Sequence, residues 1–476
     1  TLSVFWGEAC AGLSQLASQQ QRPFDLWLLD GFAPDRNPAM WSEDLFHRLA
    51  SVSTPGTAVT TFTSAGRVRR SLQALGFEMR RVDQRPYKRE SLAGTFRGVG
   101  LEKIDPPKEI HIAGAGIAAA SVARELAESG TSVRVFEASA QIAAGASGVP
   151  ITVMHPRLQA DGSASADFRV TAYAHALAAC RSYLPANSAQ PGRGIVASGA
   201  LQIASPNYPL DRLTAVEQRY GASGLHVELL SARAASEISG IPIDGPALWF
   251  RDACVVNTPA FCATLFDHPN IEVQTERPLS AWPDHPTILA CGVGTQAFPD
   301  AEFLELAAVS GQLDLISATG KRLESLKLPI VGNGYIAPLP GAEQRLDHSF
   351  GVGATYEYNP WPATEATERN LRNLERIAPE AYRSLSFHKA TRSVSSDRNP
   401  IIGSLYSLDK RQLVDKFVTT GHGSMGTVTS HLGAAMLAAR LHRDFIPLAP
   451  ALDALVSPLR FRIRQARRGY RSGATA

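Results

Sequence analysis

The sequence lacks the long apolar runs and the regular cysteines that would place a protein in a membrane or outside the cell. A membrane-spanning helix needs about 20 consecutive apolar residues, and no run approaches that length. The N-terminus has neither the basic start nor the apolar stretch of a secretory signal. We therefore expect a cytoplasmic protein with no disulfide framework and no metal site. The five cysteines, none of them in a Cys-x-x-Cys pair, are Cys10, Cys180, Cys254, Cys262 and Cys291.

Charge is sparse overall but concentrated in two places. Charged residues make up 19% of the sequence, which is ordinary for a globular protein. The length of 476 residues suggests two to four domains. Arg67–Arg97 carries nine basic and three acidic residues, and Arg460–Arg471 carries six arginines and no acid. Because the net charge is only +3, the rest of the chain is acidic. Two basic zones indicate a polyanionic partner, although solvated helix faces remain the plainer interpretation of each.

The arginines of the tail have a helical spacing. In a helix Arg460, Arg464, Arg467, Arg468 and Arg471 fall within one stripe, and only Arg462 lies off it. Such a stripe can follow phosphates without reading base sequence. We therefore predict nucleic-acid contacts at this stripe and at Arg67–Arg97.

Residues 24–82 alternate between strand-like and helix-like segments, as in half of an α/β sheet. No glycine-rich nucleotide loop precedes them, so we expect residues 1–82 to be the C-terminal part of a Rossmann-like domain, truncated in front. Residues 83–109 have the character of a linker, ending in Asp105-Pro106-Pro107-Lys108. The predicted strands are Phe24–Leu29, Thr57–Phe62 and Phe77–Val82, and the predicted helices are Trp41–Val52 and Ala65–Leu75.

A second α/β unit starts at Glu109 and carries a dinucleotide-binding pattern. Gly114 permits a tight turn after the first strand, and Gly116 lets the backbone approach a pyrophosphate at a helix N-terminus. Ala119 stands where the pattern has its third glycine. Glu137 ends the next strand, where an acid accepts hydrogen bonds from the adenosine ribose. An ordinary α/β turn with helpful glycines is the alternative.

Residues 110–445 resemble the D-amino-acid oxidase and glycine oxidase family of flavoproteins. The likeness implies bound FAD, with a glycine-rich helix N-terminus facing the negative charge of reduced flavin. It implies flavin contacts at Ala146, Ser147, Gly148, Gly292, Gly423, Ser424, Met425 and Gly426. The likeness is carried by Gly145–Gly148, Ala290–Gly294, Val309–Gln312, Thr391–Ser393, Asp397–Gly403 and Gly421–Gly426.

The same resemblance implies how the segments divide between domains. We expect a Rossmann-type FAD-binding domain interleaved with an antiparallel-sheet substrate domain. The FAD-binding domain takes about 110–164, 285–312 and 386–445, the substrate domain about 165–284 and 313–385, and a basic tail 446–476.

The N-terminal segment resembles the methyltransferase half of the bifunctional tRNA 5-methylaminomethyl-2-thiouridine biosynthesis family, in which a flavin oxidase follows. The resemblance implies a tRNA partner with a carboxymethylaminomethyl wobble uridine. The oxidase would remove the carboxymethyl group, and S-adenosylmethionine would supply the methyl group added next in a full-length protein. The front of the methyltransferase is missing, so methyl transfer by this chain alone is not expected. The matching segments are Leu29–Pro34, Asn37–Trp41, Thr61–Gly66 and Lys88–Glu90.

Four residues are predicted to act on the substrate. By the glycine oxidase resemblance, Arg392 binds the substrate carboxylate through its bidentate fork and Tyr335 shares that carboxylate. An internal salt bridge and a core aromatic are the alternatives for these two. In the methyltransferase remnant Asp30 would orient the amine and take its proton, and Phe32 would pack against uracil. A turn aspartate and a core phenylalanine are the alternatives there.

Two other functions stay open at this stage. A free amino-acid or sarcosine-type oxidase would need no tRNA, and the basic zones speak against it. A non-catalytic tRNA-binding scaffold would need no flavin, and the intact flavin segments speak against that. A flavin spectrum in the purified protein would exclude the scaffold.

Overall fold

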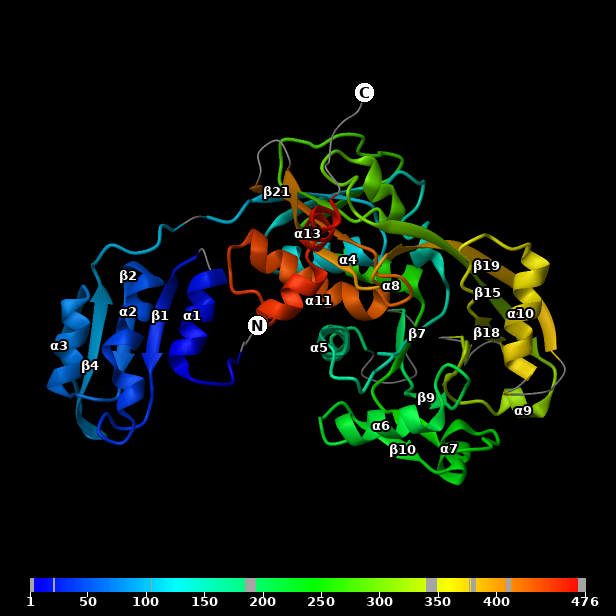
Figure 1. Cartoon of the computed structure of the whole chain (residues 1–476), viewed down its shortest axis with the longest axis horizontal. Helices are drawn as coiled ribbons and strands as arrows, with labels where there is room; N and C mark the ends of the chain where they lie inside the picture. The colour runs from blue at the N-terminus through cyan, green and yellow to red at the C-terminus, as the bar shows by residue number, and fades with distance from the viewer. Residues whose placement is uncertain are drawn as a thin grey trace. The chain divides into compact units, whose positions relative to one another are not determined.

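The computed structural model describes residues 4–19, 22–103, 105–184, 194–339, 349–375, 377, 382–407 and 412–469. The chain divides into two compact units (Figure 1). The first comprises Thr1–Pro107 and Ala438–Pro447, and the second comprises Lys108–Leu437 and Leu448–Ala476. Within the described ranges no helix is both long and apolar enough to cross a membrane.

The first unit is built on a four-stranded sheet with the order β1-β2-β4-β3. Strands β1 and β2 are parallel, whereas β4 pairs antiparallel with both β2 and β3. Ser42 caps helix α2, because its side chain accepts a hydrogen bond from the Leu45 N–H. The elements are α1 Ala9–Gln19, β1 Phe24–Leu29, η1 Pro38–Trp41, α2 Glu43–Ser51, β2 Ser53–Thr61, α3 Gly66–Ala74, β3 Phe77–Gln84 and β4 Lys88–Phe96.

The predicted linker at 83–109 is wrong in its first half, because β4 is an inner strand of this sheet. Its core-facing side chains are few: Leu92 and Phe96 are buried, while Gly94 lies between them. A Cβ at Gly94 would lie 2.8 Å from the Glu78 carbonyl oxygen, so this position must stay small. The polar start of the strand and its small residues conceal the alternation typical of a half-buried strand.

The second unit contains a six-stranded sheet with the order β13-β6-β5-β14-β21-β20. Neighbouring strands from β13 to β21 are parallel, and β20 returns antiparallel to β21. Helix α4 is buried along most of its length, and Gly130 ends it with a φ of +87°. The bounds are β5 Glu109–Ala113, α4 Ile117–Glu128, β6 Ser132–Phe136, β13 Ile271–Gln274, β14 Thr287–Leu289, β20 Ile401–Ser407 and β21 Gln412–Thr420.

An eight-stranded sheet with the order β10-β11-β9-β16-β17-β18-β15-β19 forms the other main layer of this unit. Its two longest strands, β15 and β19, pair antiparallel along their whole length. The bounds are β9 Ala200–Ile203, β10 Val227–Leu230, β11 Ala247–Phe250, β15 Leu306–Ala318, β16 Ile330–Val331, β17 Tyr335–Pro338, β18 Ser349–Gly353 and β19 Tyr382–Ser395.

A small three-stranded sheet, β7-β12-β8, and several helices complete the described part of the unit. The strands are β7 Thr152–Met154, β8 Ile195–Ala197 and β12 Cys254–Val256. The helices are η2 Ala146–Gly148, α5 Ala164–Arg181, α6 Leu210–Tyr220, α7 Ala232–Ser239, α8 Thr258–Phe266, η3 Gly292–Ala297, α9 Lys321–Glu324, α10 Ala363–Glu375, α11 Gly426–Leu441, α12 Pro450–Val456 and α13 Leu459–Arg467.

The predicted fold class is confirmed, but two predicted domain boundaries do not follow the sheets. Strand β13, placed by sequence in the substrate domain, pairs with β6 in the six-stranded sheet. Strand β19, divided by the boundary at 386, pairs with β15 over its whole length in the eight-stranded sheet. These boundaries were predicted from the positions of motifs. In the structure each strand belongs to the sheet of its hydrogen-bonded partner, which lies far away in the sequence.

The buried position of β4 gives a first test. Leu92→Ala should destabilise the first unit by about 2–5 kcal/mol, because it leaves a cavity among fully buried side chains. The matched control is Leu28→Ala, whose side chain on β1 is 68% exposed. Hydrogen exchange of the β3 and β4 amides measures the difference. Equal protection in the two variants would place β4 outside the core.

Candidate functional site

The loop between β5 and α4 is folded as the glycine pattern predicts. Gly114 has a φ of +96°, and a Cβ there would lie 2.7 Å from the Ala290 carbonyl oxygen. Gly116 is the N-cap of α4, and Ala119 is fully buried. The loop therefore turns tightly, opens a helix N-terminus, and lets the helix pack closely on the sheet.

Glu137 lies directly beside this loop. One carboxylate oxygen accepts a hydrogen bond from the Ala115 N–H at 2.7 Å, and the other accepts from the Ser139 N–H at 2.8 Å. Each oxygen keeps a further lone pair for a ribose hydroxyl. The predicted acid thus also holds the loop in shape, a structural role that spacing alone does not reveal.

The predicted loop at 145–148 lies against the N-terminus of α4. The Ser147 hydroxyl accepts a hydrogen bond from the Ile117 N–H at 2.9 Å. A Cβ at Gly148 would lie 3.0 Å from the ring of His388, whose Nε2 is buried and has no hydrogen-bond partner in the described chain. Gly148 therefore lets two backbone segments approach next to an unpaired polar atom.

The glycine-rich segment before α11 joins the same neighbourhood. Gly421 and Gly423 have φ values of +69° and +57°, and the Gly423 N–H donates to the Ser393 carbonyl at 2.9 Å. The Thr420 hydroxyl donates to the Gly292 carbonyl at 3.0 Å. Of the other residues predicted in this segment, Ser424 is exposed and Met425 and Gly426 are partly buried. Segments around 292, 393 and 423 therefore meet, as the flavin motifs require.

His422 in this segment is neutral at physiological pH. Burial lowers the pKa of His422 to about 4. Its ring nitrogens lie 3.0 Å from the Thr419 hydroxyl and 2.7 Å from the Thr429 hydroxyl. The histidine fixes the turn before α11 and brings no positive charge to it.

Arg392 projects from β19 into space left by a glycine. A Cβ at Gly311 on β15 would collide with the Arg392 guanidinium. Nη1 of Arg392 donates to the Thr355 carbonyl at 3.0 Å, and the guanidinium lies 5.7 Å from the Tyr356 ring centroid. Burial lowers the pKa of Arg392, which nevertheless remains a cation.

No internal salt bridge accounts for this arginine. Among the described residues no carboxylate oxygen lies within 4.0 Å of the Arg392 guanidinium, and Thr355 is its hydrogen-bond acceptor. A guanidinium has five N–H donors in a planar fork. Most of this fork is therefore directed at no protein acceptor, as expected of an anion-binding arginine.

The charge of Arg392 acts on Tyr335, whose hydroxyl already donates a hydrogen bond within the protein. Its hydroxyl donates to the Ile151 carbonyl at 2.8 Å. Burial raises the pKa of Tyr335 above its ordinary value, and the Arg392 charge opposes that rise only in part. The side chain is neutral, and in this arrangement its oxygen can accept but not donate a further hydrogen bond.

Sequence analysis missed three residues around Arg392. Thr355 and Tyr356 follow β18 and contact the guanidinium directly. Arg157 is exposed, and its positive charge lowers the pKa values of both Arg392 and Tyr335. No motif marks these positions, because their relation to Arg392 is created by strands distant in sequence.

Asp30 and Phe32 lie together in the first unit, directly after β1. Asp30 is exposed, and Phe32 is 70% exposed. The Phe32 carbonyl accepts a hydrogen bond from the Trp41 indole at 2.7 Å, which anchors the backbone while the ring faces outward. The alternative of a core phenylalanine is therefore wrong.

The basic zone Arg67–Arg97 is partly neutralised by its own acids. Each acid of the zone faces an arginine: Glu78 with Arg97 at 3.3 Å, Asp83 with Arg85 at 2.6 Å, and Glu90 with Arg81 at 3.4 Å. The described basic residues of the zone that are exposed and form no ion pair are Arg70, Arg80, Lys88 and Arg89, and of these Lys88 donates to the Phe62 carbonyl at 2.6 Å.

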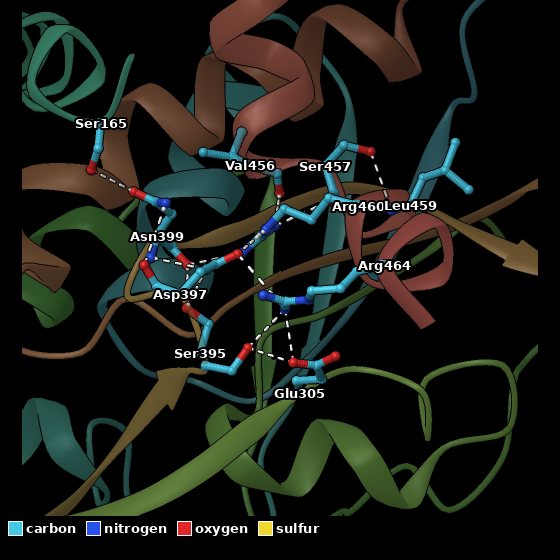
Figure 2. A network of polar contacts seen from close by, with 11 residues as sticks. Ser165, Glu305, Ser395, Asp397, Asn399, Val456, Ser457, Leu459, Arg460 and Arg464 are labelled. Atoms are coloured by element: carbon cyan, nitrogen blue, oxygen red, sulfur yellow. Dashed lines mark hydrogen bonds and ion pairs between the residues drawn. The ribbon is translucent and has the colours of Figure 1, made fainter. Parts of the chain in front are cut away.

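The predicted arginine stripe of the tail is wrong in its orientation, because its first members face the protein (Figure 2). Arg460 forms a two-point pair with Asp397, at 2.8 and 3.1 Å, and also donates to the Asn399 carbonyl at 3.1 Å. Arg464 pairs with Glu305 at 2.8 Å. Charge spacing shows a helical stripe but not which partners the rest of the fold brings to it.

This arginine clasp, formed by Arg460 and Arg464 with Asp397 and Glu305, is well enclosed. The Arg460 side chain is 13% exposed and that of Asp397 23%. Burial alone would raise the pKa of Asp397, but the hydrogen bonds and charge of Arg460 outweigh burial and lower it.

The other tail arginines differ from one another. Arg462, predicted to lie off the stripe, packs its guanidinium 3.9 Å from the Phe303 ring centroid. Arg467 and Arg468 are exposed, and Arg471 lies outside the described residues.

One group of potential metal ligands occurs in the described residues. Glu109, His111 and His285 bring their ligand atoms within 4.8 Å of one another. Arg134 Nη1 lies 3.3 Å from the same Glu109 oxygen, so a protein cation already occupies its surroundings. The group lies at the start of β5, at the opposite end of this strand from the glycine loop.

Two family models match the chain, one per predicted half. A model described as S-adenosyl-L-methionine-dependent methyltransferase matches residues 1–97, and one described as FAD dependent oxidoreductase matches residues 109–440. The chain is 29% identical to the tRNA 5-methylaminomethyl-2-thiouridine biosynthesis bifunctional protein of Pseudomonas entomophila, over 98% of this chain and 78% of that protein. The protein of that name from Pseudomonas syringae pv. tomato is 30% identical, with the same coverage.

Solved structures agree on the fold of the second unit. Glycine oxidase from Geobacillus kaustophilus superposes with a TM-score of 0.57 at 17% identity, covering 72% of this chain and 96% of that one. L-Proline dehydrogenase from P. horikoshii gives 0.60 at 15% identity, covering 76% and 99%. At these identities the likeness establishes the fold alone.

FAD is the cofactor of the second unit, and the residues present fit it. Gly114 and Gly116 leave the N-terminus of α4 open to a pyrophosphate, and Glu137 lies beside the same loop. The buried His388 Nε2 next to Gly148 has no hydrogen-bond partner among the described residues. The first unit shows no comparable set of described residues for S-adenosylmethionine. Among the described residues of the first unit, no loop with more than one glycine joins a strand to a helix. No methyl-transfer step follows from these residues.

Gly116→Val should abolish retention of FAD, because its Cβ would lie 3.0 Å from the Ser147 hydroxyl and its methyl groups would fill the pyrophosphate position. The flavin-to-protein absorbance ratio after purification measures retention. Gly245→Val is the control, since a Cβ at Gly245 meets nothing within 4 Å. A folded Gly116→Val protein with full flavin would refute the assignment.

Arg460→Met should lower the stability of the second unit by about 1–3 kcal/mol, because it leaves the Asp397 carboxylate partly buried without its partner. Arg467→Met, at an exposed position of the same helix, should have little effect. Scanning calorimetry compares the variants, and hydrogen exchange of residues 450–467 reports on α12 and α13. If both substitutions cost the same, the clasp contributes no stability.

Proposed function

Because the chain belongs to the tRNA 5-methylaminomethyl-2-thiouridine biosynthesis bifunctional family, we propose that it oxidises 5-carboxymethylaminomethyl-(2-thio)uridine at the tRNA wobble position. The product is 5-aminomethyl-(2-thio)uridine. The observation that supports this best is the Arg392 guanidinium, which lies beside Gly311 and donates to a single acceptor, the Thr355 carbonyl, among the described residues. A substrate with an N–CH₂–COO⁻ group presents the carboxylate that such a fork binds.

The reaction removes two electrons and two protons from the substrate N–CH₂ unit. Bound FAD supplies the two-electron oxidant. Water adds to the carbon of the substrate imine, the carbon–nitrogen bond breaks, and the products are an aminomethyl group on uridine and glyoxylate. The chain's task is to hold the carboxylate so that the reacting carbon has one orientation.

Arg392 performs that task in this proposal. Its fork fixes the carboxylate, and the Thr355 carbonyl and the Tyr356 ring fix the guanidinium in turn. Tyr335 lines the same site as an uncharged side chain, because its hydroxyl donates its proton to the Ile151 carbonyl. Donation by Tyr335 to the carboxylate would require this hydrogen bond to break. No protein base is assigned, since a deprotonated substrate amine needs none.

We assign FAD to the part of the second unit that contains the six-stranded sheet, and the nucleoside to the eight-stranded sheet that carries Arg392. The motif-bearing loops at 114–116, 145–148 and 421–426 are joined to the first sheet. Arg392 and Tyr335 lie on strands of the second.

The exposed cations offer the tRNA backbone its contacts. In the zone Arg67–Arg97 we assign this role to Arg70, Arg80, Lys88 and Arg89, and in the tail to Arg467 and Arg468. We also propose that Asp30 and Phe32, both exposed after β1, contact the modified base. Because the substrate is tRNA, we place the reaction in the cytoplasm.

Arg392→Met should slow flavin reduction by modified tRNA about 100-fold or more while leaving FAD bound, because the carboxylate loses a charge-assisted partner and the carbon loses its orientation. Lysine should restore only part of the rate, since it keeps the charge but not the fork. Arg383→Met, at an exposed position of the same strand, is the control. Anaerobic single-turnover absorbance measures the rate.

Two outcomes would contradict the proposal. Unchanged reduction in Arg392→Met would mean that the carboxylate is held elsewhere. Faster reduction of the wild-type flavin by glycine or sarcosine than by modified tRNA would favour a free amino-acid oxidase.

A further inference from the structure

A polar cavity of about 270 Å³ lies beside α10, and two of its lining residues also contact Arg392. Thr355 lines the cavity, and its carbonyl accepts the hydrogen bond from Arg392 at 3.0 Å. Tyr356 also lines it, with its ring 5.7 Å from the Arg392 guanidinium. The cavity is lined by α10, by the segment that follows β18 and by Asn333 in the turn between β16 and β17. Helix α10 itself packs on β15 and β18 (Figure 1). The other lining residues are Asn207, Asn333, Ala354, Trp361, Arg369, Asn370, Arg372 and Asn373.

The lining combines cations, amides and aromatic rings, and no carboxylate belongs to it among the described residues. Arg369 and Arg372 are exposed on α10, without an acidic partner in the part of the chain that the structure describes. Tyr356 is 38% exposed, and Trp361 is partly buried. Unpaired RNA is bound by this combination: arginines take phosphates, aromatic rings stack on bases, and amides pair with base edges.

One lining residue, Asn370, has a structural role, whereas the two arginines of the lining do not. The Asn370 amide donates to the Gln312 carbonyl at 2.9 Å and to Asp314 at 2.7 Å, and so fastens α10 to β15. Arg369 and Arg372 stand on the same helix but take no part in this attachment. The helix is therefore held by Asn370 while its arginines stay available.

Two buried acids lie behind the lining residues. Asp314 accepts hydrogen bonds from Asn370, Thr367 and Gln312, at 2.7, 2.6 and 3.1 Å, and so belongs to the attachment of α10. Glu357 follows Tyr356, and its carboxylate accepts from the Trp361 N–H at 2.9 Å and lies 3.3 Å from the Lys389 ammonium. Its negative charge is thus matched within the protein. The cavity keeps the positive character of its two arginines.

We propose that this cavity binds a nucleotide neighbouring the wobble uridine in the unpaired anticodon loop, with Arg369 and Arg372 on its phosphate and Trp361 or Tyr356 on its base. The proposal rests on the oxidase function given above. It makes the substrate an RNA loop rather than a modified nucleoside alone, because the cavity is occupied only when the uridine has a neighbour.

The test compares two substrates with one reaction centre: the free nucleoside 5-carboxymethylaminomethyluridine, and an anticodon stem-loop carrying it. In the holoenzyme, Arg369→Ser/Arg372→Ser should raise the stem-loop concentration for half-maximal flavin reduction by roughly tenfold. The same variant should leave reduction by the nucleoside unchanged. Arg251→Ser, an exposed arginine away from the cavity lining, is the matched control.

A second variant tests stacking. With 2-aminopurine next to the modified uridine, binding to wild type should quench its fluorescence, and Trp361→Leu should reduce the quenching. Equal effects of the arginine variant on both substrates, or on neither, would overturn the proposal. If neither substrate reduced the wild-type flavin, the oxidase function would be refuted instead. The affinity of the stem-loop for wild type and for the arginine variant would then still test the cavity, and equal affinities would overturn the proposal.

Discussion

The pairing of β15 with β19 is the constraint on which the second unit depends. Both strands run through the eight-stranded sheet in one register, and the Ser393 carbonyl of β19 accepts a hydrogen bond from Gly423 in the loop that follows β21 of the six-stranded sheet. That register sets Arg392 opposite Val309 and brings the guanidinium over Gly311. A slip by one residue would turn Arg392 to the other face of the sheet, where α10 is fastened through Gln312 and Asp314.

The parts of the site that could be predicted from sequence are those in which function depends on local backbone. The turn at Gly114, the helix start at Gly116 and the acid Glu137 all lie within one βαβ unit, and the structure places them together. Arg392 was predicted from its motif, but the motif does not predict that it has no acidic partner among the described residues. That property depends on which side chains the strands distant in sequence bring near it.

The failures have a common physical cause. Arg460 and Arg464 look like a free basic stripe because their partners, Asp397 and Glu305, lie far away in sequence. Strand β4 looks like a linker because its burial comes from lying between β2 and β3, and not from a strongly apolar sequence. In both cases long-range partners decide the outcome, and a local pattern carries no information about them.

The arginine clasp also bears on the order in which the site is completed. Glu305 lies just before β15 and Asp397 just after β19, so α13 ties the ends of the two strands that hold Gly311 and Arg392. The ribosome makes α13 after both strands. The nascent chain can therefore pair β15 with β19 before the tie exists, and the oxidase site is secured only when α13 has emerged and docked.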